Sequence, residues 1–380
     1  MKVTDVETFA LWAPRKETIS GFLPYEEHLA GFVRRGYGAC FVKVLTDEGI
    51  FGLGESIVRE VPLATAQIVD KLLKPVLVGQ DPFDVEVLWE RMFHTLRTRG
   101  HSGGFFVEAI SGVDCALWDI MGKATRLPVH KLIGGTHSDR IKAYASSILH
   151  GAPDEVSRKA EELVELGHDQ IKIKVGMGVR RDGENVKAVR DAVGYDVEIM
   201  CDANSAYNVA TAIRAGRKFE RYECLWFEEP VPPDNVPGYV RVAKALDIAV
   251  CGSESRFGRY DFRDLIAMEA VDIVQPDIAR CGGFSECRKI VAMAAAYGVP
   301  VTLHVGLSGA GCRAASLQMA ASIPRELFMN YEVYFLPNPL AHEIVAEPIE
   351  RFKDGYVELP TKPGLGLELD EERMRNYVVT

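Results

Sequence analysis

The chain has 380 residues, of which 47% are hydrophobic and 26% are charged. This length allows two domains, or one large barrel with an attached piece, and it excludes a small disulfide-stapled scaffold. The 44 basic residues against 54 acidic residues give a net charge of −10, which argues against nucleic-acid partners and against a general affinity for anionic membranes.

No stretch of the sequence predicts a membrane span or a secretory signal. The longest apolar run, residues 291–301, is interrupted by Gly298 and Pro300 and is shorter than the roughly 18 residues that a spanning helix needs. The first ten residues lack a basic region followed by an apolar one. The eight cysteines include no CxxC pair, which predicts reduced, structural thiols. We therefore expect a cytoplasmic protein.

The first 130 residues are predicted to form an α+β domain. Apolar residues alternate in two stretches, 1–12 and 38–56, and the second stretch contains a turn at Asp47–Gly49. This pattern is typical of an antiparallel meander. Helical spacing of apolar residues follows. The expected helices are 64–77, 82–94 and, with the strongest pattern, 105–125.

From residue 131 onward, short apolar runs alternate with amphipathic segments. Continuous apolar runs are typical of parallel strands that are buried on both faces, and eight of them separated by helical segments predict a closed parallel barrel. We place the barrel at 131–336 and expect the Gly- and Pro-rich segment 337–380 to return to the first domain. The runs are 141–147, 170–176, 197–204, 224–230, 248–255, 271–277, 299–304 and 327–332.

Three of these runs end in carboxylates. Asp202, Glu228 and Glu254 follow one another at intervals of 26 residues, one repeat each, and the carboxyl ends of barrel strands meet at one mouth. Hard oxygen donors without neighbouring His or Cys suit an octahedral divalent ion such as Mg²⁺. A single carboxylate at such a place is more often a helix cap or a salt-bridge partner, but the spaced trio predicts a metal site.

Two pairs of acid/base candidates end other runs. Lys172 and Lys174 are two residues apart, so both face the same side of the strand. Repulsion by a nearby cation and by the paired amine is expected to lower a lysine pKa toward the range of a general base. Asp277 and His304 end successive runs, where the carboxylate can orient the imidazole and stabilise its protonated form.

Together these residues resemble the enolase superfamily and, within it, the mandelate racemase subgroup. Residues 116–135 also resemble the family's connection between its two domains, so the resemblance covers nearly the whole chain. It implies an α/β fold, with a modified (β/α)₇β TIM barrel and an N-terminal α+β capping domain completed by the C-terminal tail. The motifs are Lys172-x-Lys174, Asp202-x-Asn204, Glu228-Glu229-Pro230, Gly252-Ser253-Glu254, Gln275-Pro276-Asp277, Gly282-Gly283, His304 and Glu332.

The resemblance implies a role for each candidate. The three carboxylates would bind one Mg²⁺ ion. Lys174 would be the base on one face of the substrate, while Lys172 would bind the substrate carboxylate. The Asp277–His304 dyad would serve the other face. Glu332 would donate a hydrogen bond to the second carboxylate oxygen, which requires Glu332 to be protonated.

Substrate specificity is expected to come largely from the capping domain. The segments 15–28 and 56–59 resemble the two mobile loops that close over the barrel mouth in this family. Their candidates for reading a sugar hydroxyl or a distal carboxylate are Tyr25, His28 and Arg59, and the alternative for each is an ordinary surface side chain. Asn204 would contact a substrate hydroxyl.

These residues suit a difficult proton transfer. A proton alpha to a carboxylate is very weakly acidic because its removal creates a dianion, and a divalent cation, a lysine and a neutral acid stabilise that charge. The resemblance implies a Mg²⁺-dependent carbon-oxygen lyase that dehydrates an aldonate or aldarate to a 2-keto-3-deoxy acid. Two alternatives stay open, a racemase or epimerase of a 2-hydroxy acid and a barrel that binds without turnover. The family and base rates also predict a homo-oligomer.

Overall fold

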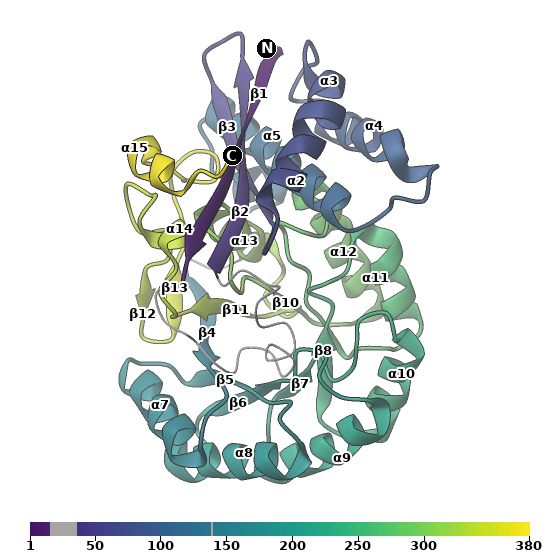
Figure 1. Cartoon of the computed structure of the whole chain (residues 1–380), viewed down its shortest axis with the longest axis vertical. Coiled ribbons are helices and arrows are strands. Elements are labelled where there is room, and N and C mark those ends of the chain that lie inside the picture. The colour runs from purple at the N-terminus through teal and green to yellow at the C-terminus, as the bar shows by residue number, and fades with distance from the viewer. Residues whose placement is uncertain (16–35, 138–139) are drawn as a thin grey trace.

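The computed structural model describes residues 1–15, 36–137 and 140–380. An antiparallel sheet and several helices lie at one end of the molecule, above a barrel of strands and helices (Figure 1). We call this upper part the cap. Its sheet has the order β1-β2-β3, with β1 (Val3–Pro14), β2 (Gly36–Thr46) and β3 (Phe51–Ile57). Its helices are α2 (Pro62–Ile68), a π-helical turn η1 (Val69–Leu73), α3 (Lys74–Leu77), α4 (Val85–Arg97) and α5 (Phe105–Thr125).

Helix α5 is the centre of the cap, and glycines let the sheet lie directly on it. A Cβ atom at Gly54 in β3 would lie 2.0 Å from the carbonyl oxygen of Gly112 in α5, so this approach excludes any side chain at that position. The short helix α6 (Val129–Ile133) then leads from the cap to the barrel. The α+β expectation for the N-terminal part is therefore confirmed.

The barrel has eight parallel strands and seven intervening helices among the described residues, and pairing between β11 and β4 closes it. This confirms the predicted (β/α)₇β architecture. The strands are β4 (Arg140–Ile148), β5 (Gln170–Lys174), β6 (Glu198–Asp202), β7 (Trp226–Glu228), β8 (Ala249–Gly252), β9 (Ile273–Val274), β10 (Val301–Leu303) and β11 (Phe328–Tyr334). The helices are α7 (Pro153–Glu165), α8 (Val179–Val193), α9 (Val209–Phe219), α10 (Val236–Ala245), α11 (Gly258–Ala267), α12 (Gly283–Tyr297) and α13 (Ala310–Ser322).

The inside of the barrel is a packed apolar layer. The rings of Tyr144 in β4 and Trp226 in β7 contact each other edge to face at 5.5 Å, although their strands are not neighbours in the sheet. Met200, Cys251 and Ile273 from the intervening strands complete this cluster. We call the carboxyl ends of these strands the mouth of the barrel. Successive side chains of a strand point to opposite faces, so the side chains two residues after this apolar layer also point inward. They lie at the mouth, directly above the apolar layer.

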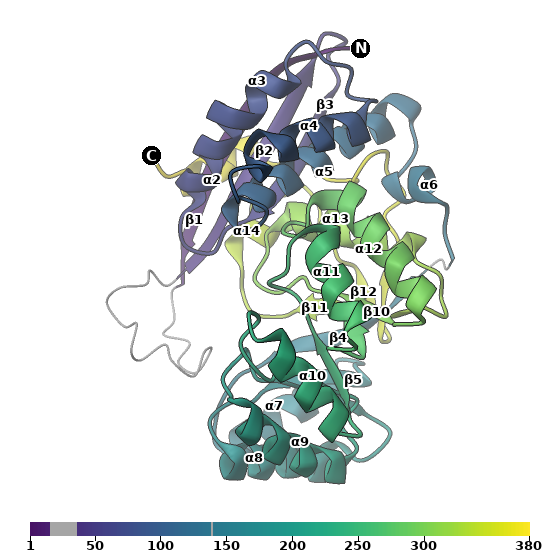
Figure 2. The same cartoon turned by 90° about the vertical axis from the view of Figure 1, so that its right-hand side faces the viewer.

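The C-terminal segment contacts both the barrel and the cap. Strand β13 pairs antiparallel with β4 of the barrel, while the backbone N–H of Val379 donates to the carbonyl oxygen of Ala10 in β1 (2.9 Å). Figure 2 shows the C-terminus beside the cap. The domain limits at residues 130 and 336 stay a prediction. The elements of this segment are α14 (Pro339–His342), β12 (Phe352–Lys353), β13 (Tyr356–Glu358), α15 (Glu371–Met374) and a 3₁₀ turn η3 (Arg375–Tyr377).

Two further observations concern the cysteines and the helices of the described residues. All eight cysteines are free and buried, as predicted for structural thiols. Within the same residues, no helix combines the length and the apolar character needed to cross a membrane.

One buried carboxyl group joins the cap to the barrel. The carboxyl oxygens of Glu55 in β3 accept hydrogen bonds from the backbone N–H groups of Gly309 (2.7 Å) and Cys312 (2.9 Å), at the start of α13. Nearby, the N–H of Ile57 donates to the carbonyl oxygen of Ala279 (3.3 Å). Burial raises the pKa of Glu55 to about 7, although these hydrogen bonds oppose the shift.

The raised pKa of Glu55 makes the stability of the fold depend on pH. A carboxyl group whose pKa rises on folding stabilises the fold while protonated, and that contribution is lost as pH climbs from the ordinary pKa to the folded one. Between about pH 4.5 and pH 7, the free energy of unfolding of Glu55→Gln should therefore rise relative to wild type by up to about 3 kcal/mol. Urea denaturation at pH 5 and pH 8 measures this change. The exposed control Glu372→Gln should show none, and an equal difference at both pH values for Glu55→Gln would contradict the assignment.

Candidate active site

The three predicted metal ligands end neighbouring barrel strands. Asp202 and Glu228 are the last residues of β6 and β7 and are direct partners in the strand register. Glu254 lies two residues beyond the end of β8. All three side chains are buried. The structure thus brings together the carboxylates that the 26-residue spacing connects.

Each of these carboxylates is paired with a cationic side chain. Lys172 Nζ lies 2.8 Å from Glu228 Oε1, Lys174 Nζ contacts Asp202 Oδ2, and Arg59 Nη2 from the cap lies 3.2 Å from Glu254 Oε1. Such pairing is expected because buried carboxylates without counter-ions would be strongly destabilising.

The two lysines lie on the inner side of β5, as predicted. Burial acts to lower the pKa of Lys172, yet Glu228 and Glu332 outweigh burial and raise it well above its usual value. Lys172 is therefore a positively charged partner of both carboxylates, and the role of Lys174 as a base stays a prediction.

The donor set of the three carboxylates fits a divalent ion. Their hard oxygen atoms come from three adjacent strands, which is the ligand type that Mg²⁺ prefers. Near them a hollow of about 380 Å³ is lined in part by Arg59, Asn204, Glu229 and Glu254. Of these side chains, Glu229 Oε1 and Asn204 Oδ1 are buried with no hydrogen-bond partner in the part of the chain that the structure describes. In the described parts of the chain no three His, Cys, Asp or Glu side chains already form a metal cluster, because the carboxylates turn toward lysine and arginine instead.

The Asp277–His304 dyad is formed as the sequence predicted. His304 Nδ1 lies 2.7 Å from Asp277 Oδ2, and Asp277 Oδ1 accepts a hydrogen bond from the backbone N–H of Ala279 (2.9 Å). His304 Nε2 faces Glu254 Oε2 at 3.2 Å. Burial acts to lower the pKa of His304, but Glu254 and Asp277 outweigh it and raise the pKa. The imidazole is therefore held with Nε2 toward the carboxylates and is readily protonated.

Glu332 differs from the expectation of a protonated donor. Its Oε2 accepts hydrogen bonds from the backbone N–H groups of Val305 and Gly306, both at 2.8 Å, and its Oε1 lies 3.0 Å from Lys172 Nζ. Burial acts to raise its pKa, but Lys172 and His304 outweigh burial and lower it well below the usual value. Glu332 is therefore an ionised acceptor here, because barrel closure places β5 and β11 on either side of β4.

The substrate-binding candidates have different outcomes. Asn204 has a positive φ of 41°, its backbone N–H donates to Asp202 Oδ1 (2.9 Å), and its side chain lines the 380 Å³ hollow. Arg59 reaches the same hollow from the cap. Tyr25 and His28 lie outside the described residues.

Several residues at the mouth were missed by reading only the last residues of each run. The indole Nε1 of Trp226 donates to Glu228 Oε2 (3.1 Å), and Ser146 in β4 hydrogen-bonds Glu332. His150 follows β4, where burial and Lys174 lower its pKa to about 4. Extending each run by three residues beyond its end would have found His150, and alternation within β4 would have found Ser146.

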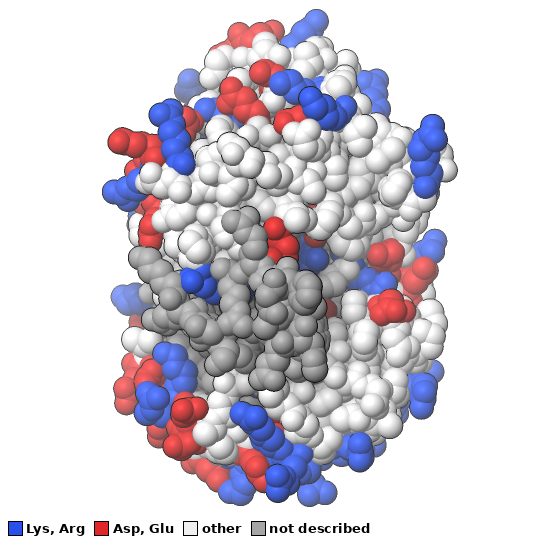
Figure 3. All heavy atoms as spheres, in the orientation of Figure 1, with Lys and Arg blue, Asp and Glu red and all other residues white. Residues whose placement is uncertain are grey.

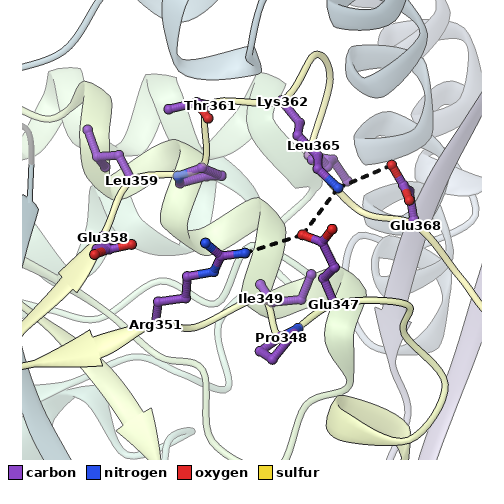
Figure 4. Close-up of a pocket in the computed structure, with 12 residues that line it drawn as sticks. Glu347, Pro348, Ile349, Arg351, Glu358, Leu359, Thr361, Lys362, Leu365 and Glu368 are labelled. Carbon is purple, nitrogen blue, oxygen red and sulfur yellow. Dashed lines mark hydrogen bonds and ion pairs between the residues drawn. The ribbon is translucent and has the colours of Figure 1, made fainter.

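Charged side chains elsewhere on the surface also form ion pairs, but these pairs are in contact with water, whereas the pairs at the mouth are buried. A hollow of about 300 Å³ lies in the C-terminal segment, and Figure 4 shows side chains that line it. Lys362 pairs there with Glu347 and Glu368, and Arg351 pairs with Glu347, each at 3.3 Å. Glu347, Arg351 and Glu368 are exposed and Lys362 is half-buried. In the space-filling view, charged side chains of both signs also meet at the waist between cap and barrel (Figure 3).

Comparison with known protein families shows to which family this chain belongs. Residues 155–373 match the model described as "Enolase C-terminal domain-like", and residues 32–134 match "Mandelate racemase / muconate lactonizing enzyme, N-terminal domain". The chain belongs to the enolase superfamily, in its mandelate racemase subgroup. The resemblance stated from the motifs is therefore confirmed, and members of this superfamily typically bind Mg²⁺.

Individual relatives in this superfamily align over nearly the whole chain. A D-galactarolactone cycloisomerase of Agrobacterium fabrum is 36% identical over 99% of both chains. An arabinonate dehydratase of Saccharolobus solfataricus is 33% identical over 88% of this chain and 89% of its own. A racemase structure from Streptomyces coelicolor with bound magnesium has a TM-score of 0.88 at 29% identity, covering 99% of this chain and 100% of that one.

The buried lysine is expected to matter for folding as well as for chemistry. Lys172→Ala leaves Glu228 and Glu332 without their shared counter-charge, which should lower the free energy of unfolding by about 3 to 5 kcal/mol. Urea denaturation in the presence of a chelator measures this loss. The matched control Lys187→Ala removes an exposed lysine that pairs with Asp191 on one helix, and its effect should be small. Equal effects of the two substitutions would contradict the role given to Lys172.

Proposed function

We propose that this protein is a Mg²⁺-dependent dehydratase of a sugar acid, either an aldonate or an aldarate. One observation carries the proposal: the two acid/base candidates flank the carboxylate strands. Lys174 is on β5, directly before β6 to β8, and His304 follows β10, two strands after them. A substrate carboxylate bound beside a divalent ion at the three acidic residues would present its alpha carbon to both Lys174 and His304.

In the first half of the reaction, the amine of Lys174 removes the proton alpha to the substrate carboxylate. A bound Mg²⁺ ion would supply positive charge to the carboxylate oxygens, where negative charge develops. Lys172, buried beside Glu228 and Glu332, adds a fixed positive charge on the same side. Preorganised contacts of this kind contribute ~3 to 4 kcal/mol each in a site closed from water.

In the second half, His304 donates its proton to the departing beta hydroxyl group. The hydroxyl leaves as water, the carbon–carbon double bond forms, and the resulting enol becomes a 2-keto-3-deoxy acid. Asp277 stabilises the protonated imidazole before the transfer, through the 2.7 Å contact with Nδ1. The net change is the loss of one water molecule. Afterwards Lys174 must release the proton that it took up, and His304 must regain the proton that it donated.

A cycloisomerase is the second candidate, favoured by the relative that is 36% identical over 99% of both chains. Such an enzyme converts its substrate into an isomer by opening or closing a ring, and the same base and acid serve if the leaving oxygen belongs to the ring. Racemisation or epimerisation requires only that His304 return the proton on the other face. A cytoplasmic location and a homo-oligomeric state stay predictions.

Product analysis in D₂O distinguishes these reactions. With a panel of aldonates and aldarates and Mg²⁺, wild type should give a 2-keto acid lighter than the substrate by one water. A cycloisomerase gives a product that is an isomer of its substrate, and a racemase or epimerase gives alpha deuterium without a keto acid.

The proposed acid and base are tested by substitution in the same assay. Lys174→Ala and His304→Ala should each lower kcat by at least about 100-fold, while the surface control Lys187→Ala should keep wild-type activity. If folded wild type loaded with Mg²⁺ transforms no member of the panel, the proposed function is wrong.

A further inference from the structure

Two tyrosine hydroxyl groups are buried near the mouth without a hydrogen-bond partner. Tyr37 in β2 of the cap and Tyr334 at the end of β11 are each only 3% exposed, and within the described residues neither hydroxyl is hydrogen-bonded. Leaving a buried hydroxyl unpaired costs about 1 to 3 kcal/mol. A pair of them in one region therefore indicates a partner that the described part of the chain does not supply.

The strand geometry places both hydroxyl groups above the candidate site. Tyr334 is two residues after Glu332 on β11, so the two side chains share a face and Tyr334 lies one step nearer the cap. In the cap, Ala39 pairs with Ile57 and Cys40 with Ser56, and continuing this register brings Tyr37 opposite Arg59.

The face of the cap sheet that carries these side chains is turned toward the barrel. Phe41 and Glu55 are register partners, and Glu55 on that face binds the start of α13. Burial raises the pKa of Tyr334, and Tyr37 and Glu332 raise it further, so both of these side chains lie near the Tyr334 hydroxyl group. Tyr37 thus lies near Tyr334 on the opposite side of the interface between cap and barrel.

Two guanidinium groups lie near the two hydroxyl groups. The guanidinium of Arg15 lies 5.7 Å from the centre of the Tyr37 ring. Arg59 interacts with both Glu254 and Tyr334, and its buried Nε has no hydrogen-bond partner among the described residues. The nearby acidic group, Glu332, is already bound by Lys172 at 3.0 Å. Hydrogen-bond donors and positive charge gathered in this way complement a carboxylate.

We propose that Tyr37, Tyr334 and Arg59 bind a second carboxylate at the far end of the substrate, so that the substrate is a sugar diacid. This inference rests on the proposed function, because it assumes that the first carboxylate lies at the acidic cluster. Arg59 is the reason why a diacid would bind more tightly than a monoacid. Glu254, which pairs with Arg59 at 3.2 Å, would also bind the divalent ion, and a second anion then balances the charge of the guanidinium. A distal hydroxyl group carries no charge that could balance the guanidinium.

Kinetics on matched acids test the proposal. Hexarates are compared with the hexonates of the same configuration, with Mg²⁺ present. Wild type should favour the diacid by at least about 10-fold in kcat/KM, and Tyr37→Phe and Tyr334→Phe should each lower kcat/KM for the diacid by about 10- to 100-fold. The loss for the hexonate should stay below about 3-fold, because that substrate lacks the second carboxylate. Equal losses on both acids, or a wild-type preference for the hexonate, would overturn the proposal.

A stability measurement separates binding from a structural role. Because their hydroxyl groups have no hydrogen-bond partner among the described residues, both Phe variants should unfold at the wild-type temperature or above it. The exposed control Tyr195→Phe should change neither stability nor kinetics. A lower unfolding temperature in the two buried variants would show that the hydroxyl groups support the fold instead.

Direct binding keeps this test independent of the reaction type. Calorimetry on the Lys174→Ala protein with Mg²⁺ should show tighter binding of the hexarate than of the hexonate, and addition of Tyr334→Phe should remove that difference. This result would support the diacid site even if no dehydration product is found. Equal binding of the two acids, or no binding of any hexarate, would overturn the site even if dehydration of a monoacid is observed.

Discussion

Buried carboxylates at the ends of neighbouring parallel strands need positive charge beside them, and this requirement organises the molecule. Asp202, Glu228 and Glu254 cannot lie together in an apolar surrounding unless cations compensate them. The chain supplies these from two directions, with Lys172 and Lys174 on an adjacent strand and Arg59 from the cap. A divalent ion bound by these carboxylates would take part in the same balance, so the geometry that makes the site costly for the fold also makes it suitable for stabilising a developing anion.

The cap contributes to the site through contacts that hold it against the barrel. Glu55 binds the start of α13, the helix that follows His304, and the backbone of Ile57 binds Ala279, two residues after Asp277. The contacts that dock β3 therefore lie beside the dyad and also carry Arg59 to the mouth. An elongated acid with one end at the acidic cluster would have its other end in contact with the cap.

The amino-acid pattern predicted the architecture and most of the site because its signals are local. Apolar runs with polar residues at their ends located all eight barrel strands, and equal spacing connected the three acidic residues. Run lengths were less well predicted: β9 is only Ile273–Val274, because most of the apolar run around it belongs to loops at the two ends of the strand.

The features that were missed depend on contacts between distant segments. Lys172 reaches Glu332 only because β11 pairs with β4, and this closure sets the ionisation of Glu332 opposite to the expectation. Tyr37 and Tyr334 look like ordinary strand aromatics in the sequence. Their hydroxyl groups stand out only when burial and the absence of partners among the described residues are known.

The most direct test of this account is to count the divalent ions that the acidic cluster binds. Mn²⁺ serves as a paramagnetic substitute for Mg²⁺, and electron paramagnetic resonance titration measures the free ion. Wild type and the exposed control Glu372→Gln should each bind one ion per chain, and Glu254→Gln should bind it at least about 10-fold more weakly. Unchanged affinity in Glu254→Gln, or no stoichiometric binding by wild type, would contradict the claim that these strand ends share a metal ion.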